Sequence, residues 1–438
     1  MSGIEIGLIS VAGMLILIYA GMHVGVALTL LSFVGVWLLR GNVTVANNLV
    51  EQAASDAISD YIFGVVPLFV LMGLLVSIAD IGRDAFDVAN QLFRRVRGGL
   101  GIATVAANAV FAAITGISIA SAAVFTKVAV PEMLRHRYTP RFSVGVVAGS
   151  SVLGMLIPPS LLLILFGVLS EQSVGKLFIA GIIPGIVLAV AYSIGIVAMG
   201  YLRPGFVGGA AAMGIDDQRL MGADEIVGKM LPIVALVALV LGGIYGGLFT
   251  PTEAGAVGAL GALVIALVKR RLTWRGFWRV LVETGHITAA ICFLIIAASL
   301  YSRFLAMSGL TDFLAHYIAE SGLGLYGMLT IFVAVVIALG CIIDSSSIML
   351  ITLPLVLPVM VGLHVDLIWL GIVTVIAVEI GLLTPPFGIA VFVIKATLPT
   401  DSPVTLNDIF AGAFPFAVIM FLVLLLVIAF PWLATALV

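Results

Sequence analysis

Residues 154–160 read Gly-Met-Leu-Ile-Pro-Pro-Ser, and residues 381–388 read Gly-Leu-Leu-Thr-Pro-Pro-Phe-Gly. Each stretch interrupts a long apolar run with two consecutive prolines, and proline inside a helix removes a backbone hydrogen bond and breaks the helix. The leading glycines and the proline pairs are separated by the same 227 positions. The chain therefore holds two related copies of one broken apolar segment.

The spacing of 227 positions also joins residues outside these stretches. It relates Gly82 to Gly309, Phe86 to Phe313, Ser118 to Ser345 and Pro131 to Pro358, and after a four-residue insertion Gly181 and Pro184 correspond to Gly412 and Pro415. The chain has 48 glycines and 17 prolines, so one match alone carries little weight. An ordered series at a nearly constant spacing predicts an internal duplication.

The composition is that of an integral membrane protein. Of the 438 residues, 62% are hydrophobic and only 10% are charged, whereas soluble domains carry about a quarter charged residues. The net charge of −2 excludes a basic nucleic-acid-binding surface. The two cysteines, Cys292 and Cys341, lie in apolar runs and form neither a disulfide framework nor a metal cluster.

Unbroken apolar runs are long enough to cross a bilayer as helices. They fall at about 4–20, 23–40, 60–80, 178–202, 229–247, 250–268, 287–306 and 413–436. Three other apolar stretches have polar or proline-containing centres: 100–133, 142–168 and 325–396. We therefore predict an all-α polytopic membrane protein built as an inverted repeat, with two re-entrant helical hairpins and two broken helices.

Basic residues give the orientation of the first hairpin. Three arginines (94, 95 and 97) precede residues 98–134 and three (135, 137 and 141) follow them. Excess Lys and Arg marks the cytoplasmic side, so both ends of this segment should lie there, with the tip near residue 116. Counting onward places the second hairpin on the opposite face and both termini in the periplasm.

Three stretches are amphipathic and are predicted to lie at the membrane surface. The strongest is 272–285, where Trp274, Phe277, Trp278 and Leu281 follow helical spacing, and 82–97 and 310–321 are similar. They are either plain surface helices or arms that brace a mobile part against a fixed part.

The hairpin tips carry the candidate binding groups. Non-helical backbone survives in a bilayer only inside protein or around a cavity, and broken helices in inverted repeats bind ions and substrate in secondary transporters. Both tips offer hydroxyl and carbonyl oxygens, hard ligands that suit Na⁺. The predicted Na⁺ ligands are Thr115, Gly116, Ser118, Gly154, Pro158, Asp344, Ser345, Ser346, Gly381 and Thr384. The alternative is that these hydroxyls only bond their own helices.

Charged residues in apolar runs are functional candidates. Arg303 either pairs with a substrate carboxylate or extends to the membrane surface, and Asp344 is either a cation ligand or a holder of the tip. Glu253 has the position of a helix cap, while Lys127 and Glu379 remain open. The predicted substrate-binding residues are Ser118, Ser121, Ser160, Arg303 and Ser345.

These residues carry a resemblance to a known family. The motifs at 154–160, 246–254 (Gly-Gly-Leu-Phe-Thr-Pro-Thr-Glu-Ala), 344–347 and 381–388 resemble those of the large membrane subunit of TRAP (tripartite ATP-independent periplasmic) transporters, the DctM-like permease. The resemblance covers essentially the whole chain. It implies an elevator mechanism in which a transport domain of two hairpins and two broken helices slides against a scaffold.

The resemblance also implies function and partners. Such subunits sit in the bacterial or archaeal inner membrane and use a sodium gradient to import organic anions such as C4-dicarboxylates or sialic acid. A periplasmic binding protein delivers the substrate, and a small four-helix membrane subunit, expected here as a separate chain, completes the transporter. The alternative is a sodium/dicarboxylate symporter of similar hairpin architecture that needs no binding protein. We expect no ATP site and no enzymatic activity, because neither a phosphate-binding loop nor an intramembrane protease motif occurs.

The expected division of the chain follows from the repeat. Two scaffold parts alternate with two transport parts and a cytoplasmic linker: 1–97 (scaffold), 98–203 (transport), 204–228 (linker), 229–322 (scaffold) and 323–438 (transport). One Na⁺ crossing ~100 mV releases about 2.3 kcal/mol, and a tenfold gradient adds about 1.4 kcal/mol. One ion cannot offset a dianion, so we predict at least two sodium sites, one per hairpin.

Overall fold

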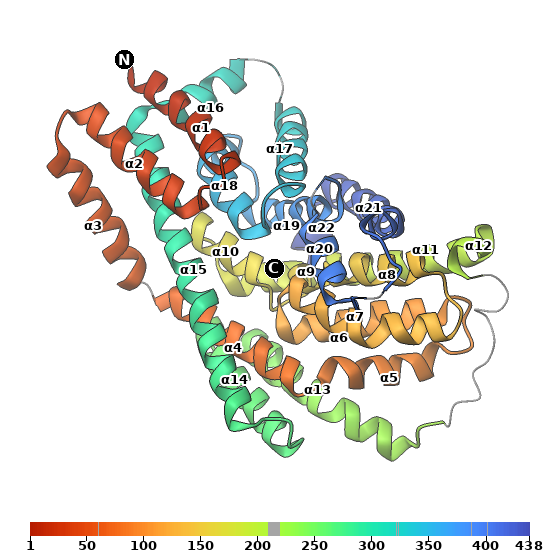
Figure 1. The fold of residues 1–438 in the computed structure, drawn as a ribbon. Coiled ribbons are helices and arrows are strands. Elements are labelled where there is room, and N and C mark those ends of the chain that lie inside the picture. The colour runs from red at the N-terminus through yellow and green to blue at the C-terminus, as the bar shows by residue number, and fades with distance from the viewer. Residues whose placement is uncertain (60, 209–219, 321, 323, 387, 401) are drawn as a thin grey trace.

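A computed structural model describes residues 1–438 except 60, 209–219, 321, 323, 387 and 401 (Figure 1). In this part of the chain helices are the only regular elements. Their bounds are α1 Gly3–Tyr19, α2 Val24–Arg40, α3 Val43–Ser59, η1 Tyr61–Gly64, α4 Val65–Ile78, α5 Ile81–Phe93, α6 Gly99–Thr115, α7 Ser118–Arg135, α8 Pro140–Ser151, α9 Leu153–Leu156, α10 Leu161–Ser170, α11 Val174–Leu202, α12 Pro204–Val207, α13 Ala223–Tyr245, α14 Pro251–Val268, α15 Trp274–Ser308, α16 Leu310–Glu320, α17 Gly324–Gly340, α18 Ser345–Gly362, α19 Leu367–Leu383, α20 Ile389–Thr397, α21 Leu406–Ala429 and α22 Trp432–Thr435. Seven described segments, namely six single helices and the interrupted stretch Pro140–Ser170 (α8–α10), are long and apolar enough to cross a membrane, or eight if the bent pair α4–α5 is one span.

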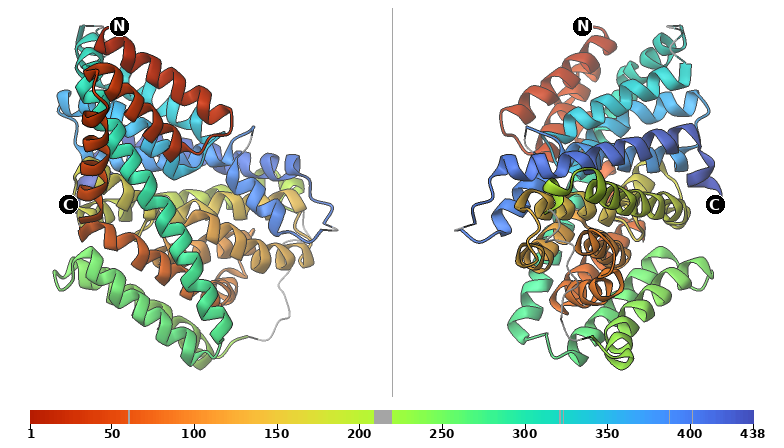
Figure 2. Two further views of the ribbon diagram at one scale, coloured as in Figure 1. Left: turned by 60° about the vertical axis from the view of Figure 1, so that its left-hand side comes forward. Right: turned by 90° about the vertical axis from the view of Figure 1, so that its right-hand side faces the viewer.

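One group of helices forms the outer side of the molecule. In Figure 1 the long α15 runs obliquely along this side, and α2, α3 and α4 pack against it. Helix α14 packs on α4, and α13 packs on α14 and on α5. Both views of Figure 2 show α13 as an outer layer beyond α4 and α5. We call α1–α4 and α13–α15 the outer group.

The second group contains the hairpins and the broken helices. Helices α6 and α7 form the first hairpin and α17 and α18 the second, while α8 packs on α21 and α19 packs on both α17 and α21. We call α6–α11 and α17–α22 the inner group. The division of the chain into scaffold and transport parts stays a prediction. Within the expected linker, residues 209–219 lie outside the described residues.

The first hairpin is where the sequence predicted it. Helix α6 ends at Thr115 and α7 begins at Ser118, so the turn at Gly116 confirms the expected tip. Helices α6 and α7 pack against each other, as expected for the two arms of a hairpin. The second hairpin turns between α17 and α18 in the same way.

The predicted separation of an interfacial helix at 272–285 from a span at 287–306 is wrong. Helix α15 runs unbroken through both, for 35 residues. Gly285 is the only weak helix former at the expected junction, and one glycine costs only about 1 kcal/mol in a helix. At the related position in the first half the helix is interrupted, because η1 separates α3 from α4. Helix α3 itself was not expected.

The last predicted span is displaced. It was expected at 413–436, whereas α21 runs from Leu406 to Ala429. Thr405 and Asp408 form a reciprocal capping box at its start, which fixes the amino end. Pro431 follows its carboxyl end, where proline cannot continue the helix.

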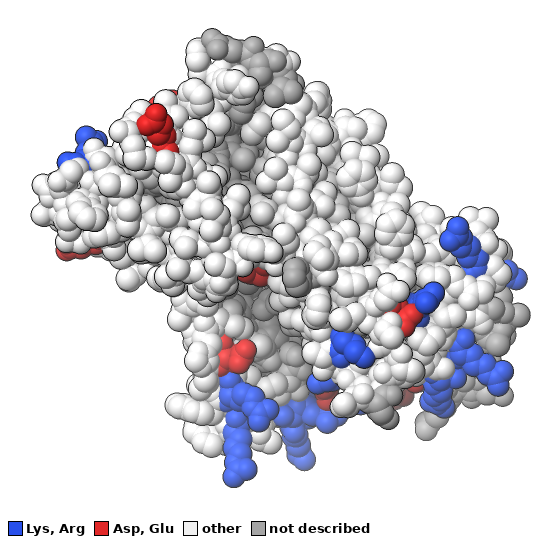
Figure 3. All heavy atoms as spheres, turned by 45° about the horizontal axis from the view of Figure 1, so that its top comes forward, with Lys and Arg blue, Asp and Glu red and all other residues white. Residues whose placement is uncertain are grey.

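Basic residues gather at one margin of the molecule. Figure 3 shows most Lys and Arg of that face along its lower and right-hand edges, with little charge between them and the opposite edge. Exposed basic residues end α7 and occupy the loop after α14, as at Arg135, Arg137 and Arg270. This distribution agrees with a cytoplasmic margin under the positive-inside rule.

Helix α5 is an arm that is fixed to the outer group. It leaves α4 at an angle of 61° and confirms a helix in the predicted stretch 82–97, whereas its position at the membrane surface stays a prediction. Asp87 pairs with Lys229 of α13 at 2.6 Å, and Asp84 pairs with Lys269 at the end of α14. Its other face packs along α6 of the first hairpin. The arm therefore contacts both groups.

Asp84→Asn is expected to lower the free energy of unfolding by about 1–3 kcal/mol, because the Asp84–Lys269 pair is largely buried and its loss strands the Lys269 charge. Asp80→Asn is the matched control, since Asp80 pairs with Arg271 at 3.3 Å where both side chains are about half exposed. It should cost less than about 0.5 kcal/mol. Thermal unfolding in detergent measures both, and equal losses would contradict the special role of Asp84.

Candidate functional site

The first hairpin tip is seated on the first proline break. Gly116 ends α6 with φ +64°, a left-handed conformation that glycine adopts readily. Its carbonyl accepts a hydrogen bond of 3.2 Å from the backbone N–H of Leu161, just after the break. A Cβ at position 116 would lie 2.4 Å from the carbonyl oxygen of Pro159. The tip and the break are therefore in direct backbone contact.

The second tip repeats this arrangement. The backbone N–H of Gly388, which is 227 positions after Leu161, donates to the carbonyl of Cys341 at 3.4 Å. Both diprolines contain a cis bond. Helices α17 and α19 also approach closely, since a Cβ on Gly381 would lie 2.5 Å from the Cα of Gly340. Each tip thus contacts the break of its own half.

Asp344 holds the second tip through its side chain. It is the N-cap of α18, and its carboxylate accepts from the Ser347 N–H at 3.0 Å and from the Ser347 hydroxyl at 2.5 Å. These bonds satisfy donors that the helix leaves open at its start. The structure shows Asp344 as a holder of the tip, and its role as a cation ligand stays a prediction.

Asp344→Ala is therefore expected to lower the free energy of unfolding by about 1 kcal/mol, whereas Asp344→Asn should cost only a few tenths, because Asn is as good an N-cap as Asp. Thermal unfolding of the purified protein in sodium-free buffer measures both without any contribution from bound sodium. An alanine variant that melts with the wild type would show that the cap does not stabilise the tip.

The hydroxyls of the first half fall into two kinds. Thr115 donates to the carbonyl of Phe111 at 2.9 Å in its own helix. Ser160 caps α10 through Leu163 and donates to the Met155 carbonyl. By contrast, the hydroxyls of Ser118 and Ser121 are buried and have no hydrogen-bond partner among the described residues. These two, one turn apart on α7, keep their bonding capacity for a ligand.

In the second half the hydroxyls converge on a carboxylate. Ser345 donates to Oε1 of Glu379 on α19 at 3.1 Å. Thr384 instead bonds the carbonyls of Ile380 and Gly381, at 2.8 and 3.0 Å, and Ser346 is half-buried beside the tip. Glu379 is fully buried, and its role was left open by the sequence. Its position as the one acidic residue in the 17 residues of α19 was the available signal.

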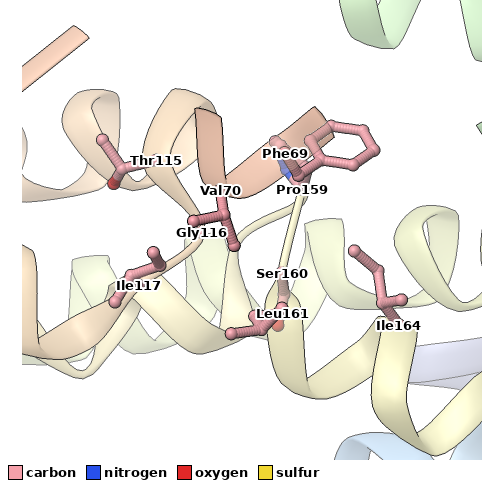
Figure 4. Close-up of a pocket in the computed structure, with 9 residues that line it drawn as sticks. All are labelled: Phe69, Val70, Thr115, Gly116, Ile117, Pro159, Ser160, Leu161 and Ile164. Atoms are coloured by element: carbon pink, nitrogen blue, oxygen red, sulfur yellow. The ribbon is translucent and has the colours of Figure 1, made fainter. Parts of the chain in front are cut away.

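A small cavity lies between the first tip and the outer group. It has a volume of about 10 Å³, close to the minimum that holds one water molecule. Figure 4 shows Phe69 and Val70 of α4 on one side of it and Thr115, Gly116 and Ser160 on the other. Here the first tip meets the outer group directly.

The remaining charged candidates are Arg303, Lys127 and Glu253. Arg303 of α15 forms an ion pair of 2.7 Å with Asp56 of α3, which uses one side of its guanidinium. Lys127 is exposed on α7. Glu253 forms a capping box with Thr250 at the start of α14, which confirms the predicted cap. Among the predicted ligands, Gly154 touches the first tip, since a Cβ there would lie 3.1 Å from the backbone of Ile117.

Comparison with known families bears on this arrangement. A family described as "Tripartite ATP-independent periplasmic transporter, DctM component" matches residues 11–433. The chain belongs to this family. The match includes both hairpins, both breaks and the outer group, so the family assignment predicted from the sequence motifs is confirmed.

Individual relatives cover most of the chain as well. The C4-dicarboxylate TRAP transporter large permease protein DctM of Pseudomonas aeruginosa is 34% identical over 375 residues, which is 85% of each chain. The sialic acid TRAP transporter large permease protein SiaM of Vibrio cholerae is 30% identical over 426 residues, which is 96% of each chain. Membership in the DctM family makes this chain a transporter permease, and its relatives are not enzymes.

A solved structure shares the fold. The YdaH transporter of Alcanivorax borkumensis, described as having an unusual topology, superposes with a TM-score of 0.56 over 85% of this chain and 87% of its own. The sequence identity is 14%, so this likeness concerns the fold alone.

Proposed function

We propose that this chain is the large permease of a sodium-driven, binding-protein-dependent importer of an organic anion: a C4-dicarboxylate, a sialic acid or another carboxylate. The names of the relatives support the substrate class. Its partners are a small four-helix membrane subunit and a periplasmic binding protein. No ATP is used, in keeping with the family description. The transporter lies in the inner membrane with both termini of this chain in the periplasm.

The observation that carries the proposal is the pair of tips seated on the pair of breaks. Each tip brings hydroxyls beside a diproline break and contacts that break through a backbone hydrogen bond, and broken helices in such transporters bind ions. One sodium site takes its ligands from Thr115, Gly116, Ser118, Gly154 and Pro158. The other takes them from Asp344, Ser345, Ser346, Gly381 and Thr384.

The substrate binds between the two tips in this proposal. Its ligands are Ser118, Ser121, Ser160 and Ser345, with Arg303 as a cationic partner. The buried hydroxyls of Ser118 and Ser121 on α7, which have no partner among the described residues, support the serine ligands in this list. A buried hydroxyl without a partner is costly until a ligand satisfies it.

Transport follows an elevator mechanism. The inner group moves as a unit and carries the tips across the membrane, while the outer group stays fixed. The contacts within each group support this division. Helix α8 packs on α21 within the inner group, and α14 packs on α4 within the outer group. The arm α5, bound to α13 and α14 by ion pairs, braces the first hairpin against the fixed group.

The function is tested by uptake into vesicles that contain this chain with its small subunit. Labelled succinate and N-acetylneuraminate are the probes, and uptake should require both an inward sodium gradient and the added binding protein. The initial rate should depend on sodium with a Hill slope above one, as expected for two ions. Uptake without the binding protein would favour the symporter alternative, and uptake indifferent to sodium would overturn the coupling.

A further inference from the structure

Residues 269–279 join α14 to α15 and form the first turns of α15. They read Lys-Arg-Arg-Leu-Thr-Trp-Arg-Gly-Phe-Trp-Arg, with five basic residues and no acidic one. Figure 1 shows the start of α15 at the lower end of the molecule, and the lower edge in Figure 3 is one of those where basic residues gather. We call this segment the basic turn. The proposed transport mechanism makes no use of it.

Only part of the positive charge of the basic turn is balanced within the chain. Lys269 pairs with Asp84 of the arm α5, and Arg271 lies 3.3 Å from Asp80, just before the arm. The three other basic residues are exposed and form no ion pair with any described residue: Arg270, Arg275 and Arg279. Their three positive charges are left for a partner outside the chain.

Arg270 is held in a costly backbone conformation. Its φ is +54°, in the left-handed region, which a residue with a Cβ adopts only at a cost in free energy. The position follows Lys269, the C-cap of α14, where glycine is the usual residue. Strained backbone of this kind is found at functional sites, which indicates a use for the arginine side chain.

Two exposed tryptophans lie beside the arginines of α15. Trp274 is 78% exposed and Trp278 is 61% exposed. Each of them directly precedes an arginine, Arg275 or Arg279. Residues four apart are neighbours on a helix surface, so an apolar stripe runs beside a basic stripe. Tryptophan is enriched at the level of the lipid headgroups, where one end of its ring is in apolar surroundings and the other in water.

The apolar part of α15 gives the depth of these side chains in the bilayer. Glu283 and Arg303 are charged, and residues 284–302 between them contain no Lys, Arg, Asp or Glu. At about 1.5 Å per residue this stretch spans about 28 Å, close to the hydrocarbon thickness of about 30 Å. The basic turn therefore lies just outside the hydrocarbon, among the phospholipid headgroups.

We propose that the basic turn binds the headgroup of one anionic phospholipid, such as phosphatidylglycerol. The lipid phosphate lies between Arg275 and Arg279, because guanidinium groups bind phosphate through paired hydrogen bonds. The amino end of α15 also favours an anion. One acyl chain lies along Trp278 and along Val282, which is 44% exposed and one turn further on. A zwitterionic headgroup binds more weakly, since its cationic group is repelled by the arginines.

The site belongs to the outer group and goes beyond the proposed transport function. The same segment holds the arm α5 through Lys269 and Arg271. A lipid bound at the basic turn therefore ties both the outer group and the arm to one leaflet of the bilayer.

The test measures lipid binding to the purified full-length chain. The protein is stripped of lipid in detergent and titrated with phosphatidylglycerol or phosphatidylcholine, and the bound lipids are counted by native mass spectrometry. The wild type should bind its first phosphatidylglycerol at least about tenfold more tightly than its first phosphatidylcholine. The double variant Arg275→Gln/Arg279→Gln should lose this preference, because each basic residue near a headgroup contributes to binding. A preference that survives in the folded double variant would overturn the proposal.

Two control variants separate the site from net charge. Arg135→Gln/Arg137→Gln removes two exposed charges at the end of α7, where no tryptophan is adjacent in sequence, and it should keep the preference. Arg275→Lys/Arg279→Lys keeps the charge and should stay within about threefold of the wild type. An equal loss of preference in both glutamine double variants would show that net charge alone attracts the lipid.

A second measurement locates the lipid in vesicles. A brominated acyl chain quenches the fluorescence of a tryptophan that it touches. Brominated phosphatidylglycerol should quench the wild type more than brominated phosphatidylcholine at the same low fraction, and Arg275→Gln/Arg279→Gln should abolish the difference. Equal quenching of the wild type by both lipids would place the lipid elsewhere. Glycerol phosphate, a headgroup without chains, should not displace the lipid at equal concentration, and displacement would assign the site to a small free anion.

Discussion

Gly412→Ala is expected to prevent α21 from packing on α8. A Cβ at position 412 would lie 2.0 Å from the carbonyl oxygen of Arg141 and 3.1 Å from the Cα of Gly145. Both neighbours are backbone atoms, so no side-chain rotation relieves the overlap and the two helices must separate. Overpacking of a core commonly costs about 1–3 kcal/mol, and we expect about 3 kcal/mol or more here. The yield of monodisperse protein and its melting temperature in detergent measure the loss.

Gly242→Ala is the control for this prediction. Gly242 lies within α13, where an added Cβ meets nothing within 4 Å. Alanine should leave stability unchanged or raise it by up to about 1 kcal/mol, because it is the better helix former. If the Gly412 and Gly242 variants behave alike, the close crossing of α8 and α21 does not exist in the native protein.

Gly116→Ala is expected to lift the first hairpin tip from its break and to reduce sodium-driven uptake at least about tenfold. Two effects act together at this position. Alanine disfavours the left-handed backbone by about 1–2 kcal/mol, and its Cβ would lie 2.4 Å from the carbonyl oxygen of Pro159. The contact with Pro159 would displace backbone atoms beside the predicted sodium ligands.

Gly309→Ala separates these two effects. Gly309 ends α15 with φ +73°, and a Cβ there meets nothing within 4 Å. Alanine at position 309 therefore has the cost of a left-handed backbone conformation but makes no steric contact. Uptake by vesicles, corrected for the amount of folded protein, should be near wild type for Gly309→Ala and low for Gly116→Ala. Similar uptake by both would show that the contact with Pro159 does not position the tip.

The features that the sequence predicted correctly depend on local chemistry. The paired prolines at 158–159 and 385–386 interrupt their helices, and the segment 98–134 between the arginines turns back at Gly116. The first and last residues of the helices were harder to predict from the sequence. Helix α15 continues through Gly285 because a single glycine is a weak helix breaker. Helix α21 starts earlier than expected because Thr405 caps it.

The candidate site was predictable in part. The hydroxyls at both tips follow from the repeat, but their bonding does not, since Thr115 bonds its own helix and Ser118 does not. The environment of Glu379 on α19 depends on α18, since Ser345 bonds this carboxylate from 34 positions away. No pattern along the chain reveals that they meet, so the burial of this carboxylate became visible only in the fold.

The length of α15 has a practical consequence for measuring transport. Its 35 residues span about 52 Å, well beyond a hydrocarbon thickness of about 30 Å, and it packs against α2, α3 and α4 along the way. A spin label at the exposed Trp278 on this helix is therefore a reference point that should stay fixed relative to the bilayer. Under the proposed elevator mechanism, its distance to a second label at Leu134, at the end of α7, should change as the first hairpin moves.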